Sequence, residues 1–248
     1  MNLNLNNFLK ACLGICYLNI TSLLRSPLWI PSMLLPPLAM VIIFFIIGGK
    51  PLAIHALIGA VIASTANTGL YLPRLVILLK HSQLQDIFVA SPVGKFSYMT
   101  GLALSRLIGS SPAILTFITA LLIIKPVDAS KISVLLLLIF LTWLMCCLIG
   151  FSIATYIKNI VHADAISNLL SLALILLPPI YYPLNLLSKN IYAYTIALAI
   201  PTTHLAEAAR IFVLESPPPI NPSIHTLSII VYIIIFAILS SRSRWREP

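Results

Sequence analysis

The chain has 248 residues, of which 60% are hydrophobic and only 8% are charged, and its mean hydropathy is +1.04. A soluble domain carries about 25% charged residues, so this chain has too few polar side chains to cover a surface in water. The composition predicts a protein whose surroundings are membrane lipid. The net charge of +9 comes from Lys and Arg at the ends of apolar runs rather than from one basic face, which argues against nucleic acid as a partner.

Residues 1–25 predict a helix that lies in the membrane interface rather than crossing the bilayer. Leu5, Phe8, Cys12 and Cys16 recur at helical spacing, with polar residues largely elsewhere. A signal peptide is a poorer interpretation, because only Lys10 precedes the apolar part and no small-residue cleavage site follows. We therefore treat 1–25 as an amino-terminal interfacial segment and 26–248 as a single membrane domain.

Six apolar runs in the membrane domain are long enough to cross a bilayer, which takes about 20 residues in a helix. Gly48-Gly49-Lys50-Pro51 predicts a tight turn after the first run, and Pro178-Pro179 should break the fifth. The predicted spans are residues 28–47, 52–72, 96–124, 132–157, 163–182 and 223–240.

The segment between the fifth and sixth spans, residues 183–222, predicts a re-entrant or outer-surface helical hairpin. Pro183 and Pro201 bracket an apolar run that is too short to span. After it, Glu207 and Arg210 are three residues apart on one helical face and can pair, and His204 can reach Glu207. A metal site would need more ligands than these, so a structural role in the hairpin is the better interpretation.

The basic residues indicate which side of the membrane each segment faces. With the amino terminus inside, ten basic residues fall on inner segments and five on outer ones, a bias that favours two cytoplasmic termini. The inner set is Lys10, Arg25, Arg74, Lys80, Lys95, Arg106, Lys158, Arg242, Arg244 and Arg246, and the outer set is Lys50, Lys125, Lys131, Lys189 and Arg210. Arg106 stands about 20 residues before Lys125, which puts it at the inner interface with its side chain reaching for headgroups.

No constellation for catalysis stands out in the sequence. It contains no G-x-x-x-x-G-K-[ST] phosphate loop, no H-E-x-x-H and no G-x-S-x-G. The four cysteines have no accompanying His at zinc-ligand spacing and are interpreted as small apolar residues. The chain is therefore expected to be neither an ATPase nor a metal enzyme, with no cofactor of its own; an intramembrane enzyme is the weakest alternative.

Two polar stripes interrupt the apolar spans. The second span carries Ser64, Asn67 and Thr68 at mid-depth, and the fifth carries Asn168 and Ser171 along one face. Small polar residues in membrane helices serve interhelical hydrogen bonds, so packing and lining of a translocation path are both open interpretations.

Two stretches resemble the membrane subunits of ABC-2 type exporters, and the order of elements fits that family along nearly the whole chain. The first stretch is SQLQDIFVASPVGKFSYMTG, similar to a coupling helix followed by Ser-Pro-Val and the third span. The second is LPPIYYPLNLLSKNIYAYTIALAIPTTHLAEAAR, similar to the Pro-rich end of the fifth span and the outer hairpin with its Glu-x-x-Arg ending.

The resemblance implies an all-α membrane protein with six transmembrane helices, an amino-terminal interfacial helix, a cytoplasmic coupling helix after the second span and an outer re-entrant hairpin after the fifth. It also implies a plasma-membrane permease that forms the path with a second copy or a paralogue. A separate ATP-binding subunit, holding ATP and Mg²⁺, would dock on the coupling helix. The contact residues implied are Gln83, Leu84, Asp86, Ile87, Phe88, Ser91 and Pro92.

Two alternatives stay open at this point. The apolar side chains of the coupling segment could rest on the membrane surface instead of filling a groove in a partner. The chain could also be a secondary transporter or channel that needs no ATPase, although such proteins usually carry intramembrane acidic residues and Asp164 stands at a helix end.

Overall fold

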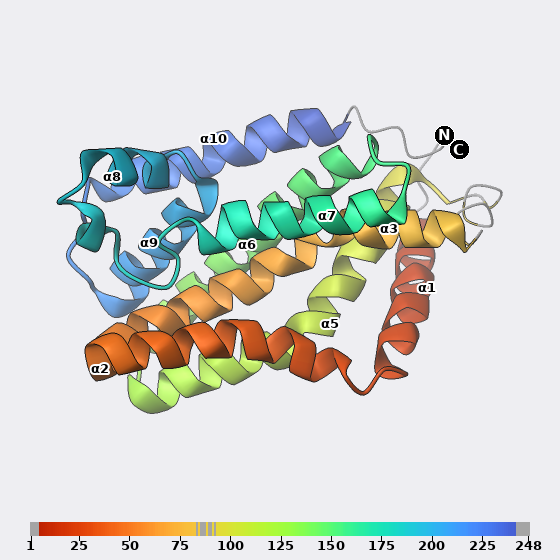
Figure 1. The fold of residues 1–248 in the computed structure, drawn as a ribbon. Helices are drawn as coiled ribbons and strands as arrows, with labels where there is room; N and C mark the ends of the chain where they lie inside the picture. The colour runs from red at the N-terminus through yellow and green to blue at the C-terminus, as the bar shows by residue number, and fades with distance from the viewer. Residues whose placement is uncertain (1–4, 83, 85–87, 89–90, 92, 242–248) are drawn as a thin grey trace.

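A computed structural model describes residues 5–82, 84, 88, 91 and 93–241, and within these ranges the chain forms helices and no strand. Most of the long helices run along one direction, so that the molecule has two ends (Figure 1). The α3 end holds α1, α3 and the starts of α5 and α7; the α8 end holds α8 and the turn inside α2. The predicted all-helical fold is confirmed for the described residues.

The helix α2, Trp29–Leu70, contains the first two predicted spans. Gly49 interrupts it with φ 63° and ψ −158°, a conformation that glycine adopts without steric cost. The chain reverses there, so one half of α2 runs toward the α8 end and the other half returns (Figure 1). The second half continues past Tyr71 into α3, Leu72–His81. The turn expected at residues 48–51 is thus present, but the helical bounds are Trp29 and Leu70 rather than 28 and 72.

Close packing of α2 on α6, Ala129–Ala154, depends on two glycines. A Cβ atom on Gly69 would overlap backbone atoms of Cys146 and Cys147, and a Cβ on Gly150 would overlap the carbonyl oxygen of Gly69. Small residues let membrane helices approach backbone to backbone, where dispersion contacts and not water exclusion hold them. This crossing lies next to the main core, in which Leu70 and Cys146 are fully buried.

The third and fourth predicted spans correspond to α5, Lys95–Ile124, and α6. α5 agrees with the prediction of 96–124. α6 begins three residues earlier than the predicted 132 and ends at Ala154 instead of 157. At its start, Asp128 is extended and takes the N-cap position, and its carbonyl accepts the first helical bonds. The apolar run alone did not mark that start.

The fifth predicted span, 163–182, is shorter than expected. α7, Ile160–Ser171, continues through a π-helical turn at Leu172–Leu176, and the helix ends before Pro178 and Pro179. Both prolines lack an N–H and clash with the preceding turn, so they break the helix as predicted. The residues from 178 to 182 are non-helical and bend back into the molecule, which the hydropathy of the stretch did not reveal.

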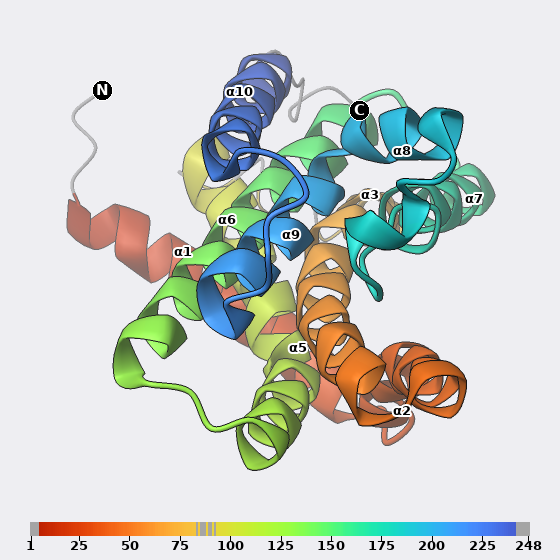
Figure 2. The same ribbon diagram turned by 90° about the vertical axis from the view of Figure 1, so that its left-hand side faces the viewer.

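The α8 end is closed by the predicted hairpin. A short 3-10 turn at Leu184–Leu187 leads to α8, Ile191–Leu198, which meets α9, Pro201–Leu214, at 93°. Figure 2, which views this end, shows α9 in the middle of the bundle, with α10, Pro222–Ser241, beside it. α9 packs on α2, α6 and α10, and most of its side chains are buried. The predicted sixth span, 223–240, corresponds to α10.

The amino-terminal helix α1, Leu5–Leu24, runs across the direction of the other long helices (Figure 1). It packs on α5: Cys12 Sγ donates to the Ser97 carbonyl at 3.3 Å, and Ile15 lies against Gly101. The crosswise orientation suits the predicted interfacial segment. By length and composition alone, however, residues 6–24 are also apolar enough to cross a membrane.

Five helices of the described chain are long and apolar enough to span a bilayer, or six if the bent α8–α9 pair is one span. One of the five runs from Trp29 to His81, and 53 helical residues are about 80 Å long, far more than the roughly 30 Å of a hydrocarbon core. The reversal at Gly49 resolves this by dividing the stretch into two passes. The chain is a multi-pass membrane protein.

Candidate functional site

The predicted coupling segment, residues 83–92, is only partly described. Gln83, Asp86, Ile87 and Pro92 lie outside the described residues; Leu84, Phe88 and Ser91 lie at the α3 end. Leu84 is exposed, whereas Phe88 is half-buried against Tyr98, with ring centroids 5.8 Å apart. Ser91 Oγ donates to the Phe88 carbonyl at 2.7 Å. Phe88 therefore packs on α5, and Leu84 presents an apolar side chain to the outside.

The two polar stripes of the sequence meet in the fold. Three contacts follow one another along α7 and the α2–α3 helix, which run antiparallel. Ser171 Oγ donates to Asn67 Oδ1 at 2.9 Å, and Tyr71 Oη donates to Asn168 Oδ1 at 3.0 Å. Arg74 Nε lies 2.8 Å from Asp164 Oδ1, with both side chains about half exposed (55% and 42%). We call this set of residues the polar line: Asn67, Tyr71, Arg74, Asp164, Asn168 and Ser171.

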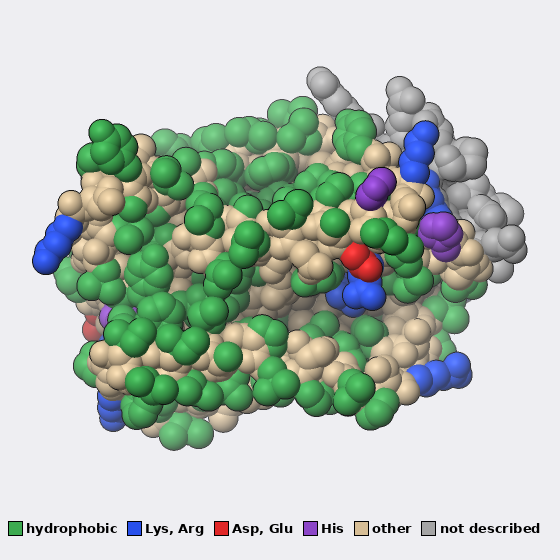
Figure 3. Space-filling view, viewed as in Figure 1, with side chains coloured by type: hydrophobic (Ala, Val, Ile, Leu, Met, Phe, Trp, Pro, Cys, Tyr) green, Lys and Arg blue, Asp and Glu red, His purple; other side chains and the backbone are tan. Residues whose placement is uncertain are grey.

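The polar line lies on an open face of the molecule. All six of its side chains are partly or largely exposed, although the neighbouring positions on α2 are buried. Figure 3 shows this face: a red and blue group lies beside a recess between α7 and the first half of α2, amid a largely hydrophobic surface. A lipid tail gives such groups no hydrogen bonds, so the exposed polar line indicates a place where another molecule or water is expected.

The structure divides the five residues predicted for a translocation path. Asn67, Asn168 and Ser171 belong to the polar line. Ser64 and Thr68 are buried inside the bundle, and Thr68 Oγ1 donates to the Thr65 carbonyl of its own helix. With 5% and 1% of their surfaces exposed, these two side chains are not part of the face that carries the polar line.

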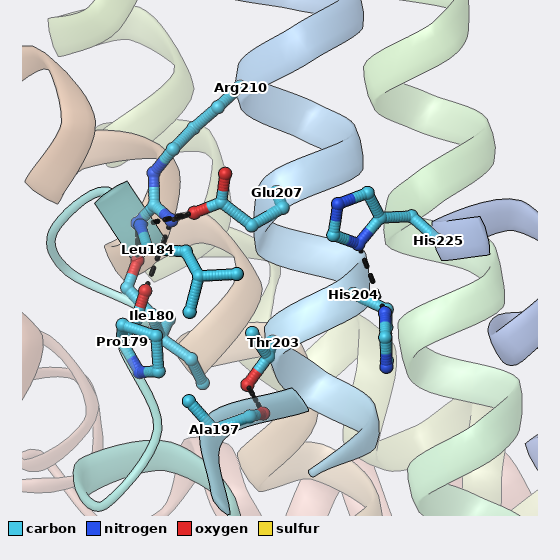
Figure 4. A network of polar contacts seen from close by, with 9 residues as sticks. All are labelled: Pro179, Ile180, Leu184, Ala197, Thr203, His204, Glu207, Arg210 and His225. Atoms are coloured by element: carbon cyan, nitrogen blue, oxygen red, sulfur yellow. Dashed lines mark hydrogen bonds and ion pairs between the residues drawn. The ribbon is translucent and has the colours of Figure 1, made fainter. Parts of the chain in front are cut away.

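A second polar network is enclosed at the α8 end (Figure 4). Arg210 is fully buried and pairs with Glu207 at 2.5 Å, as their spacing predicted. Its guanidinium also donates to the carbonyls of Pro179 and Ile180, and Glu207 Oε1 accepts from the Leu184 backbone N–H at 2.9 Å. Arg210 and Glu207 thereby replace the backbone partners that the chain loses where α7 ends at the prolines.

His204 does not reach Glu207, contrary to the prediction. Its Nδ1 lies 3.0 Å from Nδ1 of His225 on α10, and its Nε2 lies 2.9 Å from the Leu198 carbonyl (Figure 4). A carbonyl only accepts, so His204 carries its proton on Nε2, and the proton between the two rings belongs to His225 Nδ1. The spacing of residues on α9 could not foresee this partner, because His225 comes from another helix.

The two prolines of the hairpin each stand at the start of a helical segment. Pro183 is extended (ψ 139°) and precedes the 3-10 turn, and Pro201 opens α9, where a missing N–H costs nothing. Thr203 Oγ1 donates to the Ala197 carbonyl at 2.6 Å, which fixes the angle between α8 and α9.

The loop after α5 is tied to the end of α9. Lys125 Nζ donates to the Leu214 carbonyl at 2.8 Å, and Lys131 Nζ lies 2.8 Å from Glu215 Oε1. The Lys131 ammonium holds the pKa of the Glu215 carboxyl below its usual value. The two contacts join the segment between α5 and α6 and the start of α6 to the end of α9. The Lys131–Glu215 pair is largely exposed on the Glu215 side and adds little to stability.

In the part of the chain that the structure describes, no three His, Cys, Asp or Glu side chains lie close enough together to hold a metal ion. The two groups of polar side chains described above, the enclosed network at the α8 end and the exposed polar line, are held together by hydrogen bonds and ion pairs.

A family model described as ABC-2 type transporter matches residues 12–214. The chain belongs to the ABC-2 type transporter family. Membership makes it the membrane subunit of a transporter, as the two sequence motifs predicted. The matched range begins within α1, includes the polar line and the α8–α9 hairpin, and ends where α9 ends. No curated protein matches the chain.

Sequence reasoning missed three members of the two networks in this ABC-2 chain. The polar stripes do not include Tyr71, the charge pattern marks Arg74 only as an inner basic residue, and no motif contains His225. Tyr71 and Arg74 do continue the spacing of Asn67 by one and two turns, which is a signal that could have found them.

Proposed function

We propose that this ABC-2 chain is the membrane-spanning permease of an ATP-driven exporter, working with a second copy or a paralogous permease. In this arrangement the polar lines of two permeases face one another and border the translocation path. Six passes, both termini on the cytoplasmic side and a plasma-membrane location complete the proposal. The α3 end is then the inner end, as the excess of basic residues on its segments favours.

The observation that carries this proposal is the exposure of the polar line. A single subunit leaves six polar or charged side chains on a face that lipid would otherwise cover. A second permease on that face would replace lipid by protein and leave room for a polar cargo between the two lines. Packing alone is a poorer account, because Arg74 and Asn168 remain exposed after their contacts with α7 and α3 have formed.

The energy source in this proposal is a separate subunit that binds ATP and Mg²⁺. The chain itself contains no phosphate loop. Exposed Leu84 would enter an apolar groove of that subunit, with Asp86 among the polar groups at its rim. Phe88, held on Tyr98, would pass the movement of the segment to α5. ATP binding would then move packed helices as rigid bodies and open the path outward.

The test is isolation of the chain with its partner, followed by ATPase and transport measurements on the complex in vesicles. We expect an ATP-binding subunit to co-purify, and we expect Asp86→Lys or Leu84→Asp to abolish the stimulation of its ATPase activity by this chain. Lys189→Glu, a charge reversal at an exposed position before α8, at the other end of the molecule, is the control. Recovery of a fully active transporter that contains no ATP-binding subunit would refute the proposal and favour a secondary transporter or channel.

A further inference from the structure

Arg106 is a charge that the described chain does not neutralise. It stands on α5, its Nε is buried without a hydrogen-bond partner, and the side chain as a whole is only partly exposed. No ion pair joins it to any acidic side chain of the described residues. A buried arginine without a counter-charge is costly in a membrane protein, so its persistence calls for an anion from outside the chain.

Arg106 lies beside the polar line. Arg74 and Tyr71 are both within electrostatic range of its guanidinium. Arg74 is paired with Asp164, which leaves Arg106 without a carboxylate of its own. The cluster therefore holds an excess of one positive charge, with a tyrosine hydroxyl next to it.

The position of the cluster in the bundle limits which ligands can reach it. Figure 1 shows α5 behind the gap between the first half of α2 and α3, and Figure 3 shows a recess with charged groups on that face. Arg74 follows the last turn of the second pass, and Arg106 stands 19 residues, or about 28 Å of helix, before Lys125 at the opposite end of α5. Both arginines thus stand near one boundary of the hydrocarbon core, the level at which lipid phosphates are found.

We propose that Arg106 and Arg74 form a binding site for the phosphate group of an anionic amphiphile that enters the recess from the leaflet at the α3 end. A guanidinium donates several N–H groups in a plane that matches phosphate oxygens. The bound molecule is a resident phospholipid or the phosphate-bearing part of the cargo; the chemistry of the site is the same for both. In naming a class of cargo the inference rests on the proposed function, but binding itself requires neither ATP nor transport.

The simpler interpretation, an arginine that extends to water past the lipid, predicts no such preference. A snorkelling side chain places its guanidinium in water or among headgroups of any kind. The buried Nε of Arg106 and the neighbouring Arg74 instead concentrate positive charge at one spot, which favours an anionic headgroup over a zwitterionic one.

The experiment measures lipid retained by the purified full chain after exchange into nanodiscs of equal parts phosphatidylglycerol and phosphatidylcholine, using native mass spectrometry. We expect one phosphatidylglycerol per chain to be retained. Arg106→Gln should lower its apparent affinity about tenfold, since a charge-assisted contact is lost. Arg25→Gln, at an exposed arginine after α1, is the matched control and should retain the lipid.

One further arm addresses the source of the phosphate, and a second controls for folding. Displacement of the lipid by glycerol 3-phosphate would show that the phosphate group alone occupies the site, as a phosphate-bearing cargo requires, and failure of displacement would show a resident phospholipid that is held by its acyl chains as well. Arg106→Lys, which keeps the charge, should keep most of the preference and shows that a loss in Arg106→Gln is not misfolding. Equal retention of both lipids by the unmodified chain, or unchanged phosphatidylglycerol affinity in a folded Arg106→Gln variant, would overturn the proposal. Failure of the transport assay would leave this binding result intact, so the two proposals can fail separately.

Discussion

The α8 end and the polar line use similar side chains in opposite circumstances. At the α8 end, Arg210 and Glu207 are enclosed, and together they make hydrogen bonds to three backbone groups. Along the polar line, Arg74 and Asp164 are half exposed and make one contact with each other. An ion pair that is enclosed and also binds backbone fixes a fold, because removing either partner leaves a buried charge. An exposed pair adds little to stability and remains available to another molecule.

Similar side chains therefore have a structural role at one place and a proposed functional role at the other. At the α8 end they stabilise the chain where prolines interrupt the helix. Along the polar line they put polar groups on a surface that would otherwise suit lipid. Substitutions at the two places should therefore differ in kind: the first should reduce folding, and the second should reduce transport in a folded protein.

The largest loss of stability is expected from Arg210→Met. The change leaves Glu207 as an unpaired buried carboxylate and removes donors from the Pro179 and Ile180 carbonyls. Breaking a buried pair in this way costs about 3–5 kcal/mol, a large part of the stability of an ordinary domain. Thermal unfolding and yield in detergent would measure it, with Lys189→Met at an exposed outer cation as the control. Equal melting temperatures for the two variants would show that the enclosed network is not structural.

A smaller loss is expected from Gly59→Val. A Cβ atom at Gly59 would overlap the carbonyl of Ile180, the group to which Arg210 donates. Forcing atoms into a packed interior costs about 1–3 kcal/mol, and here it also displaces a partner of Arg210. Gly14→Val is the control, since nothing lies within 4 Å of a Cβ at that position. If Gly59→Val melts no lower than Gly14→Val, the loop at residues 178–182 is not packed as described.

His225→Phe should cost less again. The ring volume is kept, but His204 Nδ1 loses its donor inside the bundle, a change worth about 1–2 kcal/mol. The expected result is a modest fall in melting temperature, absent from His162→Phe at an exposed position on α7. An equal fall in melting temperature in both variants would show that the histidine pair between α9 and α10 makes no particular contribution to stability.

Much of the fold could be predicted because hydropathy and proline mark where membrane helices run and stop. The runs that became α5 and α10 were located to within about one residue at their ends. The breaks at Gly49 and Pro178 followed from what glycine permits and proline forbids. The start of α6 after Asp128 was less visible, since the helix begins before the apolar run does.

The sites could be predicted only as far as contacts are local. Glu207 and Arg210 are one turn apart, so their pairing follows from helix geometry. Arg74 and Asp164 are 90 residues apart, and nothing in the spacing of either helix brings them together. The same limit explains the wrong partner given to His204: Glu207 is one turn away, but its carboxylate is taken by Arg210 and Leu184, and His225 arrives from α10.

The most direct test of the polar line is transport by Asn67→Leu in vesicles containing the chain and its ATP-binding partner. Asn67 and Ser171 are both partly exposed, so loss of their hydrogen bond should change stability by no more than about 1 kcal/mol. Thr116→Leu, on the exposed face of α5, is the matched control. We predict normal yield and melting temperature for both variants, and a severe loss of transport for Asn67→Leu alone. Transport that falls only in proportion to folded protein, or falls equally in the two variants, would contradict the assignment of the path to this face.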